Sequence, residues 1–305
     1  MPTRHILSVL DLSPEEISGI VHRAVSLAGE PRSAALSGKT VALLFEKPSL
    51  RTRASFDVGI SQMGGHALYM GPDEVGLGRR ERVSDVARVL SRYVDCVVAR
   101  VNSHSSLQEL VETGSVPVVN ALSDLEHPCQ ALADLQTIYE HKGGFGGLRV
   151  AYIGDGNNVA RSLCLAAASV GASFTIAAPS GYGLDGETLE AAGLRAAPAG
   201  AEVASVSDPV EGVAGADVVY TDVWTSMGQE EESDARRKAF AEYTVDGDLL
   251  AKAAEGAIFM HPMPAHYGEE VPEGMLEHPQ SASYEQAGNR LHAQKAALEL
   301  IMGVS

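Results

Sequence analysis

Apolar residues are spaced along the chain in two alternating patterns. Short continuous apolar runs, such as Thr40–Phe45 and 148–153, are typical of strands buried on both faces of a sheet. Between these runs, apolar residues recur every three or four positions, as in 128–142, which is typical of amphipathic helices. The strands that we expect on this pattern are 40–45, 67–70, 96–101, 116–119, 148–153, 173–177, 201–204, 216–221 and 257–260.

Helices are expected between these strands. The first opens with Ser13-Pro-Glu-Glu16, where a serine N-cap, a proline at the first helical position and a glutamate three residues on signal a helix start. Strands that alternate with helices specify parallel sheets with right-handed crossovers. The expected helices are 13–27, 52–63, 83–93, 106–113, 128–142, 158–170, 185–193, 209–213, 247–253 and 283–302.

A glycine-rich stretch at 143–147 separates two series of alternations. A chain of 305 residues is also longer than a single core usually supports, and domains of roughly 150 residues are the expectation. The sequence therefore predicts an α/β protein with two successive doubly wound parallel-sheet domains, 1–142 and 143–282, followed by one long helix.

The charge balance narrows the possible partners. The chain has 23 basic and 40 acidic residues, a net charge of −17, which argues against nucleic acid and anionic membranes. Such a surface suits high salt, where screening weakens self-repulsion, although it also serves solubility alone. No stretch is apolar enough to span a membrane and no signal peptide is visible, so we expect a cytoplasmic protein. The three cysteines form no CxxC pair, which favours buried reduced thiols over a zinc site.

An anion site is indicated directly after the first strand. Ser49, Arg51, Thr52 and Arg53 lead from that strand into a helix. Guanidinium groups grip two phosphate oxygens at once, and the free N–H groups of a helix N-terminus add further donors. The alternative is a solvated basic turn, but basic residues are scarce in this chain, so two arginines in one turn favour an anion site.

Two further positions follow strands of the same series. Arg100 closes one strand, and His127 and Gln130 open the helix after another. Ligands of open α/β sheets bind outside the carboxyl ends of the strands, so these side chains are candidates for contacting a carbonyl or phosphate oxygen. Taken alone, Arg100 suits a structural charge equally well, and His127 suits a cap or a core histidine.

The second series carries different chemistry. Gly154-Asp-Gly156 follows a strand but lacks the GxGxxG pattern of dinucleotide loops, and the next residues are Asn157 and Asn158, whose amides both donate and accept hydrogen bonds. Asp222 follows a later strand and could hold an ammonium group, with Ser226 and Met227 nearby, or could be a turn residue.

The segment His261-Pro-Met-Pro264 follows the last strand. Its two prolines restrict the backbone, so its carbonyl groups can orient the NH₂ group of a ligand.

Together these motifs resemble, in order and spacing, those of the ornithine carbamoyltransferases. The resemblance rests on Ser49-Leu-Arg-Thr-Arg53, His127-Pro-Cys-Gln130, 222–228, His261-Pro-Met-Pro264 and Asn289-Arg-Leu-His292, and it covers essentially the whole chain. It implies carbamoyl transfer from carbamoyl phosphate to L-ornithine, without a metal or organic cofactor, in a trimer or a multiple of trimers.

The resemblance also implies roles for individual residues. The first domain, with helix 283–305 returning to it, would bind carbamoyl phosphate, and the second would bind ornithine. Arg51, Arg100, His127 and Asp222 would be catalytic. The residues implied for carbamoyl phosphate are Ser49, Leu50, Arg51, Thr52, Arg100, His127, Gln130, Pro262, Met263 and Arg290, and those for ornithine are Asn158, Asp222, Ser226 and Met227.

Three positions depart from the family pattern. Leu50 stands where the family usually has Thr, and Gly76 where many members have Gln. The usual His-Cys-Leu-Pro reads His261-Pro-Met-Pro264, as in aspartate-specific relatives, but the acidic segment 222–231 suits an amine rather than a second carboxylate.

Alternatives to this function remain open at the level of sequence. They are a transcarbamylase for another amine, a non-catalytic sensor that binds the same ligands, and a nucleotide-dependent oxidoreductase.

Overall fold

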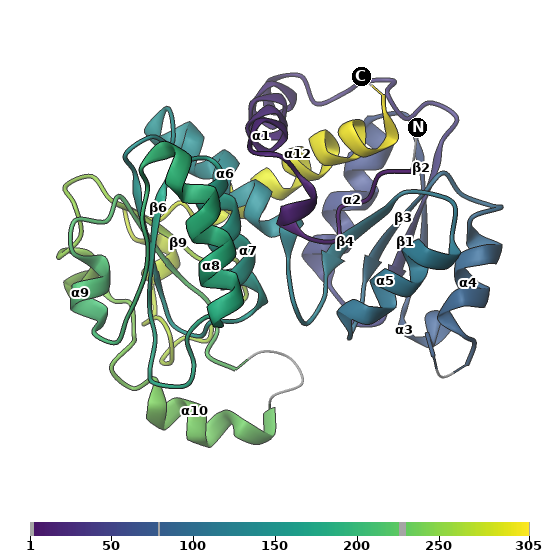
Figure 1. Ribbon diagram of the computed structural model, residues 1–305. Coiled ribbons are helices and arrows are strands. Elements are labelled where there is room, and N and C mark those ends of the chain that lie inside the picture. The colour runs from purple at the N-terminus through teal and green to yellow at the C-terminus, as the bar shows by residue number, and fades with distance from the viewer. Residues whose placement is uncertain (1–2, 79, 226–229, 305) are drawn as a thin grey trace. The chain divides into compact units, whose positions relative to one another are not determined.

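The computed structural model describes residues 3–78, 80–225 and 230–304, and the chain divides into two compact units (Figure 1). The first unit comprises Met1–Gln136 and Gly288–Ser305, and the second comprises Thr137–Ala287. Each unit is built around one parallel sheet, so the prediction of two α/β parallel-sheet domains is confirmed.

The first unit has a four-stranded sheet in the order β2-β1-β3-β4. Its strands are β1 (Thr40–Phe45), β2 (His66–Met70), β3 (Cys96–Arg100) and β4 (Val118–Leu122), and every pairing is parallel. Its helices are α1 (Pro14–Gly29), α2 (Leu50–Gln62), α3 (Pro72–Val75), α4 (Val83–Leu90) and α5 (His104–Thr113), with a 3-10 turn η1 (Val9–Asp11).

Two long helices belong partly to each unit. The division of the chain falls within α6 (Pro128–Lys142) and again within α12 (Ser283–Met302). The sequence predicts a boundary after residue 142, at the glycine-rich stretch that follows the end of α6. The contacts therefore change from one unit to the other inside the helix.

Helix α12 packs on α2 in the first unit. A Cβ atom on Gly59 would lie 3.1 Å from Lys295 Cγ and 3.3 Å from Leu291 Cδ1, so any larger residue would require these side chains to shift. Lys295 Nζ donates to Gln62 Oε1 at 3.0 Å and to the carbonyl of Pro31. The long helix thus returns to the first unit, as expected.

The second unit has a five-stranded parallel sheet in the order β7-β6-β5-β8-β9. Its strands are β5 (Arg149–Ile153), β6 (Ser173–Ala177), β7 (Val203–Val206), β8 (Val218–Thr221) and β9 (Ile258–Met260). Its helices are α7 (Asn158–Ser169), α8 (Gly186–Ala196), α9 (Pro209–Val213), α10 (Ser233–Ala239) and α11 (Gly247–Leu250), with 3-10 turns η2 (Ala197–Ala199), η3 (Glu230–Glu232) and η4 (Met275–Glu277). Figure 1 shows α7 and α8 side by side on one face of this sheet.

Each sheet contributes to a core of its own. In the first unit, Leu44, Val97 and Ala99 from the central strands pack against residues of α4 and α5. In the second unit, the core includes an aromatic group in which Trp224 stacks on Phe240, with ring centroids 5.8 Å apart.

The three cysteines are buried and free, as expected. Within the described residues, no helix is long and apolar enough to cross a membrane.

Candidate functional site

The turn after β1 ends at the N-terminus of α2, where Ser49 is the N-cap. Its Oγ accepts the N–H of Thr52 at 3.4 Å, and its carbonyl accepts the N–H of Arg53 at 3.2 Å. Thr52 is fully buried, and its Oγ1 accepts a hydrogen bond from Arg290 Nη2 of α12. The helix N-terminus and a guanidinium group are therefore held next to each other in the first unit, which favours an anion.

Three arginines share this region of the first unit. Arg100 ends β3 and is buried, and burial is the main reason why its pKa falls to about 10. The positive charges of Arg290 and Arg51 lower that pKa further. Within the described residues, Arg100 Nε has no hydrogen-bond partner. Like charges that converge on one buried place, with a donor left over, indicate a site for an anionic ligand.

His127 and Gln130 add neutral groups to the same region. The pKa of the buried His127 lies well below its usual value because of burial first, and then because of the charges of Arg290 and Arg100. Its imidazole is therefore neutral at pH 7. Gln130 Nε2 donates to Asp134 Oδ1 at 2.8 Å, whereas Gln130 Oε1 has no partner among the described residues and can accept from an NH₂ group.

Leu50 is the first residue of α2 and is 82% exposed. A large apolar side chain in this position, beside Arg51, makes none of the polar contacts that a threonine could offer. The N–H groups of the helix end remain as the donors at this position.

In the second unit, the buried Asp222 follows β8. Its Oδ2 accepts from Asn157 Nδ2 at 2.9 Å, and its Oδ1 accepts the N–H of Val223 at 2.8 Å. Burial raises the pKa of this carboxyl, while the neighbouring His261 and the hydrogen bonds from Asn157 and Val223 oppose the rise. A buried carboxylate that is oriented in this way is suited to an ammonium group.

The two asparagines after β5 differ in what they do. Asn157 is the N-cap of α7, since its Oδ1 accepts the N–H groups of Val159 at 2.9 Å and Ala160 at 3.0 Å. Asn158, the residue that the sequence singled out, is the first residue of α7 and is partly exposed. Asn157 therefore links the start of the helix to Asp222, a role that the sequence analysis did not assign.

The turn that resembles a dinucleotide loop is closed in this structure. The N–H of Gly156 donates to the carbonyl of Tyr182 at 2.7 Å, and a Cβ atom on Gly156 would lie only 2.4 Å from the carbonyl carbon of Gly183. Because this N–H is already used and the neighbouring loop lies against it, the turn does not present it to a pyrophosphate.

The segment after β9 is held by a buried pair, His261 and Glu270. His261 Nε2 lies 3.2 Å from Glu270 Oε1, and His261 Nδ1 accepts the N–H of Met263 at 2.9 Å. Met263 has a φ of 53°, a left-handed backbone conformation that residues other than glycine rarely adopt. The histidine thus helps to hold the backbone of Pro262 and Met263 in one conformation.

Sequence reasoning did not find Glu270, Asp155 or Arg236, and it named Asn157 only as one of two asparagines that could donate and accept hydrogen bonds. Glu270 and Asn157 orient site residues, and Asp155 and Arg236 form a buried ion pair. Two predicted residues, Ser226 and Met227, lie outside the described residues. The remaining predicted residues divide between the units. Ser49, Leu50, Arg51, Thr52, Arg100, His127, Gln130 and Arg290 belong to the first unit, and Asn158, Asp222, Pro262 and Met263 belong to the second.

One group could in principle hold a metal ion. Ligand atoms of His266, Glu269 and Glu270 lie within 4.8 Å of one another. Glu269 is already paired with Arg237 at 2.9 Å, and Glu270 Oε1 accepts the N–H of His266 at 2.6 Å. These contacts account for the arrangement of the group without an ion.

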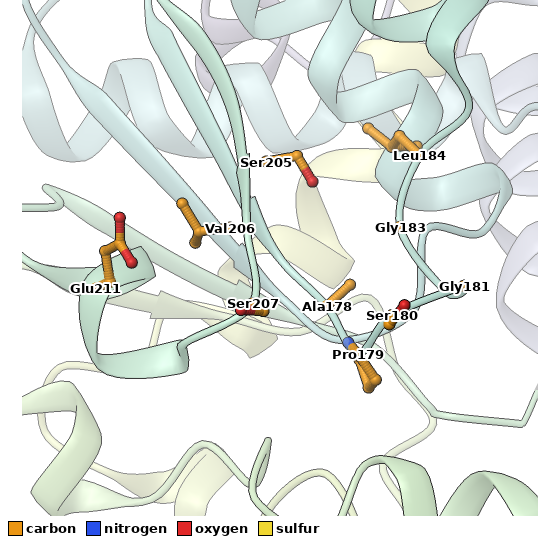
Figure 2. Close-up of a pocket in the computed structure, with 10 residues that line it drawn as sticks. All are labelled: Ala178, Pro179, Ser180, Gly181, Gly183, Leu184, Ser205, Val206, Ser207 and Glu211. Atoms are coloured by element: carbon orange, nitrogen blue, oxygen red, sulfur yellow. The ribbon is translucent and has the colours of Figure 1, made fainter.

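A separate hollow of about 910 Å³ lies at the carboxyl ends of β6 and β7 (Figure 2). It is lined by 178–181, Gly183, Leu184, 205–207 and Glu211, and Figure 2 shows Ser205 and Glu211 at its edge. It contains none of the residues predicted from the sequence.

Two family models match the chain. The carbamoyl-P binding domain of aspartate/ornithine carbamoyltransferase matches residues 4–140, and the Asp/Orn binding domain of the same family matches residues 146–301.

Individual relatives and solved structures agree with these matches. Ornithine carbamoyltransferases of Pyrococcus abyssi and Acidothermus cellulolyticus are 48% and 51% identical to the chain, and each comparison covers 98% of this chain and 96% of the relative. The solved ornithine carbamoyltransferase of Pyrococcus furiosus superposes with a TM-score of 0.95 at 47% identity, over 99% of this chain and 98% of that one. That of Thermus thermophilus gives 0.90 at 42% identity, over 99% and 100%.

Proposed function

The chain belongs to the aspartate/ornithine carbamoyltransferase family, and from this premise we propose that it transfers the carbamoyl group of carbamoyl phosphate to the side-chain amine of L-ornithine. The products are citrulline and phosphate. The observation that carries the proposal is the convergence of Arg51, Arg100 and Arg290 in the first unit. The protein has a net charge of −17, yet three guanidinium groups lie in this region, where they can pair with the two negative charges of a phosphate group.

The first unit supplies the donor site. Ser49, Arg51 and Thr52 hold the phosphate, together with the N–H groups at the start of α2 and the guanidinium of Arg290. Arg100 and the neutral imidazole of His127 face the carbonyl oxygen, and Gln130 Oε1 accepts from the carbamoyl NH₂ group. These roles match the free donor on Arg100 and the free acceptor on Gln130.

The second unit supplies the acceptor site. Asp222 and Asn158 receive the amino acid, with Ser226 and Met227 assigned by position in the family motif. The backbone at Pro262 and Met263 presents carbonyl groups to the carbamoyl NH₂ group. The segment after Asp222 is rich in glutamate and contains no arginine before position 236, which favours an amine-bearing side chain over the second carboxylate of aspartate.

The reaction that these groups support is a direct acyl transfer. The lone pair of the neutral amine forms a bond to the carbamoyl carbon, and the carbonyl oxygen gains negative charge. The bond from that carbon to the phosphate oxygen then breaks, its electron pair leaves with phosphate, and the departing phosphate takes up the one proton that the amine nitrogen loses. Arg100 and His127 donate to the developing charge on the carbonyl oxygen, and Arg51 stabilises the departing phosphate. No metal or organic cofactor takes part.

Three finer properties belong to the same proposal. Two related ornithine carbamoyltransferases, from Pyrococcus furiosus and Campylobacter jejuni, are named anabolic, which favours flux toward citrulline. The family resemblance favours a homotrimer or a multiple of trimers. The acidic surface favours a salt-rich cytoplasm as the place of action.

The test is the formation of ureido product from carbamoyl phosphate with L-ornithine, aspartate, putrescine, lysine and N-acetylornithine, at low and at molar salt. Strong preference for L-ornithine is expected. Activity with another amine alone would reassign the pocket around Asp222, and saturable binding without turnover would favour a sensor.

A further inference from the structure

Arg236 of α10 is buried and makes an unusual number of contacts for one side chain. Its Nη1 donates to Asp155 Oδ2 at 3.0 Å and to the carbonyl of Trp224 at 2.9 Å, and its Nε donates to Glu232 Oε2 at 3.1 Å. Its guanidinium also lies over the ring of Tyr182, 5.2 Å from the centroid. Neither the sequence motifs nor the reaction described above uses this residue.

These contacts join parts of the second unit that lie far apart in sequence. Trp224 comes two residues after Asp222, and Glu232 lies in η3, directly before α10. One guanidinium therefore ties both sides of the segment 225–231 to Asp155, which follows the central strand β5.

The short turn that begins at Asp155 also orients Asp222. Asp155 holds Arg236, and Asn157, two residues later, donates to Asp222 Oδ2 at 2.9 Å. The carbonyl of Asp155 accepts the N–H of Asn157 at 2.8 Å, so the two anchors are coupled through one turn. A shift of Asp155 would move both the backbone at Trp224 and the hydrogen bond to Asp222.

We propose that Asp155 and Arg236 are positioning residues for the amino acid substrate: their buried ion pair sets the place of Asp222 and of the backbone that follows it. The inference rests on the proposed function, because ornithine is the ligand whose affinity it concerns. Neither residue touches the reacting atoms, so the pair acts on substrate affinity and alignment rather than on the chemical step.

The charges around the pair give it a dependence on pH. Burial raises the pKa of Asp155 to about 6, although the charge and hydrogen bonds of Arg236 lower it, and the nearby carboxylates of Asp222 and Glu232 raise it. The pair is therefore intact above pH 6. As the pH falls through about 6, Asp155 gains a proton, the ion pair is lost and ornithine binding weakens.

The first experiment compares Arg236→Gln with Arg237→Gln in the full-length enzyme. Arg237 is the neighbour on the same helix, but it is exposed and pairs with Glu269 and Asp234, so it is the matched control. We expect Arg236→Gln to raise KM for L-ornithine about 10- to 100-fold. The KM for carbamoyl phosphate should stay within about twofold of its original value. Arg237→Gln should alter neither constant.

Two further variants guard against simple loss of folding. Arg236→Lys keeps the charge but lacks the planar guanidinium whose Nη1 holds Asp155 and the carbonyl of Trp224 while its Nε holds Glu232, so partial rescue is expected. The double change Asp155→Asn with Arg236→Gln removes both charges and leaves no buried charge unpaired. Its KM for ornithine should match that of Arg236→Gln alone, because the two residues act as one unit.

The pH profile provides a readout that a merely structural role would not move. The ratio of KM for ornithine in Asp155→Asn to that in the original enzyme should be large at pH 8 and should approach one below pH 6. Using the ratio cancels the titration of ornithine itself.

Two results would overturn the inference. One is a similar rise in both KM values together with a fall in kcat, and the other is an unchanged KM for ornithine in a folded Arg236→Gln variant. Failure of the original enzyme to make citrulline would instead refute the proposed function, so the two failures are distinguishable. In that event, calorimetric titration of L-ornithine into the original and Arg236→Gln proteins, with inorganic phosphate present, still decides the inference. Equal affinity would refute it.

Discussion

At the scale of single residues, Arg51 and Arg100 are the clearest targets. We expect Arg51→Ala or Arg100→Ala to lower kcat about 10²- to 10³-fold, because each removes one donor from the charge that develops in the transition state. Steady-state kinetics with both substrates saturating measures the loss. Arg88→Ala, on the exposed face of α4, is the control. Near-normal turnover in either test variant would remove that arginine from the mechanism.

Leu50 allows the opposite kind of change. Leu50→Thr places a hydroxyl at an exposed position beside the phosphate contacts, so it should strengthen carbamoyl phosphate binding by about 1 kcal/mol, or roughly fivefold in KM. The measurement is KM for carbamoyl phosphate at saturating ornithine, and Leu50→Val, which has the shape of threonine but no hydroxyl, is the control. An equal gain in both variants would mean that the hydroxyl makes no contact.

The sequence predicted the site residues that follow strands, because parallel strands bring their carboxyl ends to one edge of a sheet. Arg100 at the end of β3 and Asp222 after β8 are examples, and both are buried. Arg236 and Glu270 could not be found in this way. Arg236 acts through Asp155, which is distant in sequence, and nothing in the sequence distinguishes it from Arg237 beside it. Glu270 lies in a loop and acts through His261, and a glutamate in a loop carries no pattern of its own.

At the scale of elements, the helix caps of α1 and α2 can be compared directly. Ser13 caps α1 in a full capping box, accepting the N–H of Glu16 at 3.2 Å, and lies in no proposed site. Ser13→Ala should destabilise the first unit by about 1 kcal/mol, or roughly 2–4 °C in Tm, with unchanged kinetics. Ser49→Ala should lower Tm and also raise KM for carbamoyl phosphate. Thermal unfolding and kinetics on both variants test this, and an unchanged KM in Ser49→Ala would leave Ser49 a cap alone.

The elements themselves were predicted well where their pattern was long or continuous. The bounds of α6, α12, β1 and β6 agree with the sequence prediction. Strand β4 starts two residues later and runs further than expected, because it contains Asn120, whose buried amide donates to the carbonyl of Leu7 at 2.8 Å. A polar residue satisfied by a distant backbone cannot be recognised as strand from its neighbours. The short helices α3 and α10 were missed because a few polar residues show no periodicity.

At the scale of the whole molecule, the net charge of −17 predicts a response to salt. Added KCl screens the repulsion among surface carboxylates, since the Debye length falls from about 10 Å at 0.1 M to about 3 Å at 1 M. We expect Tm to rise between 0.1 and 2 M KCl, and specific activity to be retained. Differential scanning calorimetry and the ureido assay measure both. Full activity at low salt, with loss of activity in molar salt, would contradict the interpretation of the acidic surface.

The first unit takes Gly288–Ser305 from beyond the entire second unit. During synthesis on the ribosome, this order determines when each part of the first unit becomes available. The nascent chain exposes Arg51 and Arg100 early, while Arg290 and the residues that cover Gly59 of α2 emerge only after Thr137–Ala287 has been translated. A fragment that stops at residue 142 would therefore lack part of its own core and the third guanidinium group. The proposed carbamoyl phosphate site is therefore completed only after the second unit has been synthesised. A prematurely terminated chain should not bind carbamoyl phosphate as the finished protein does.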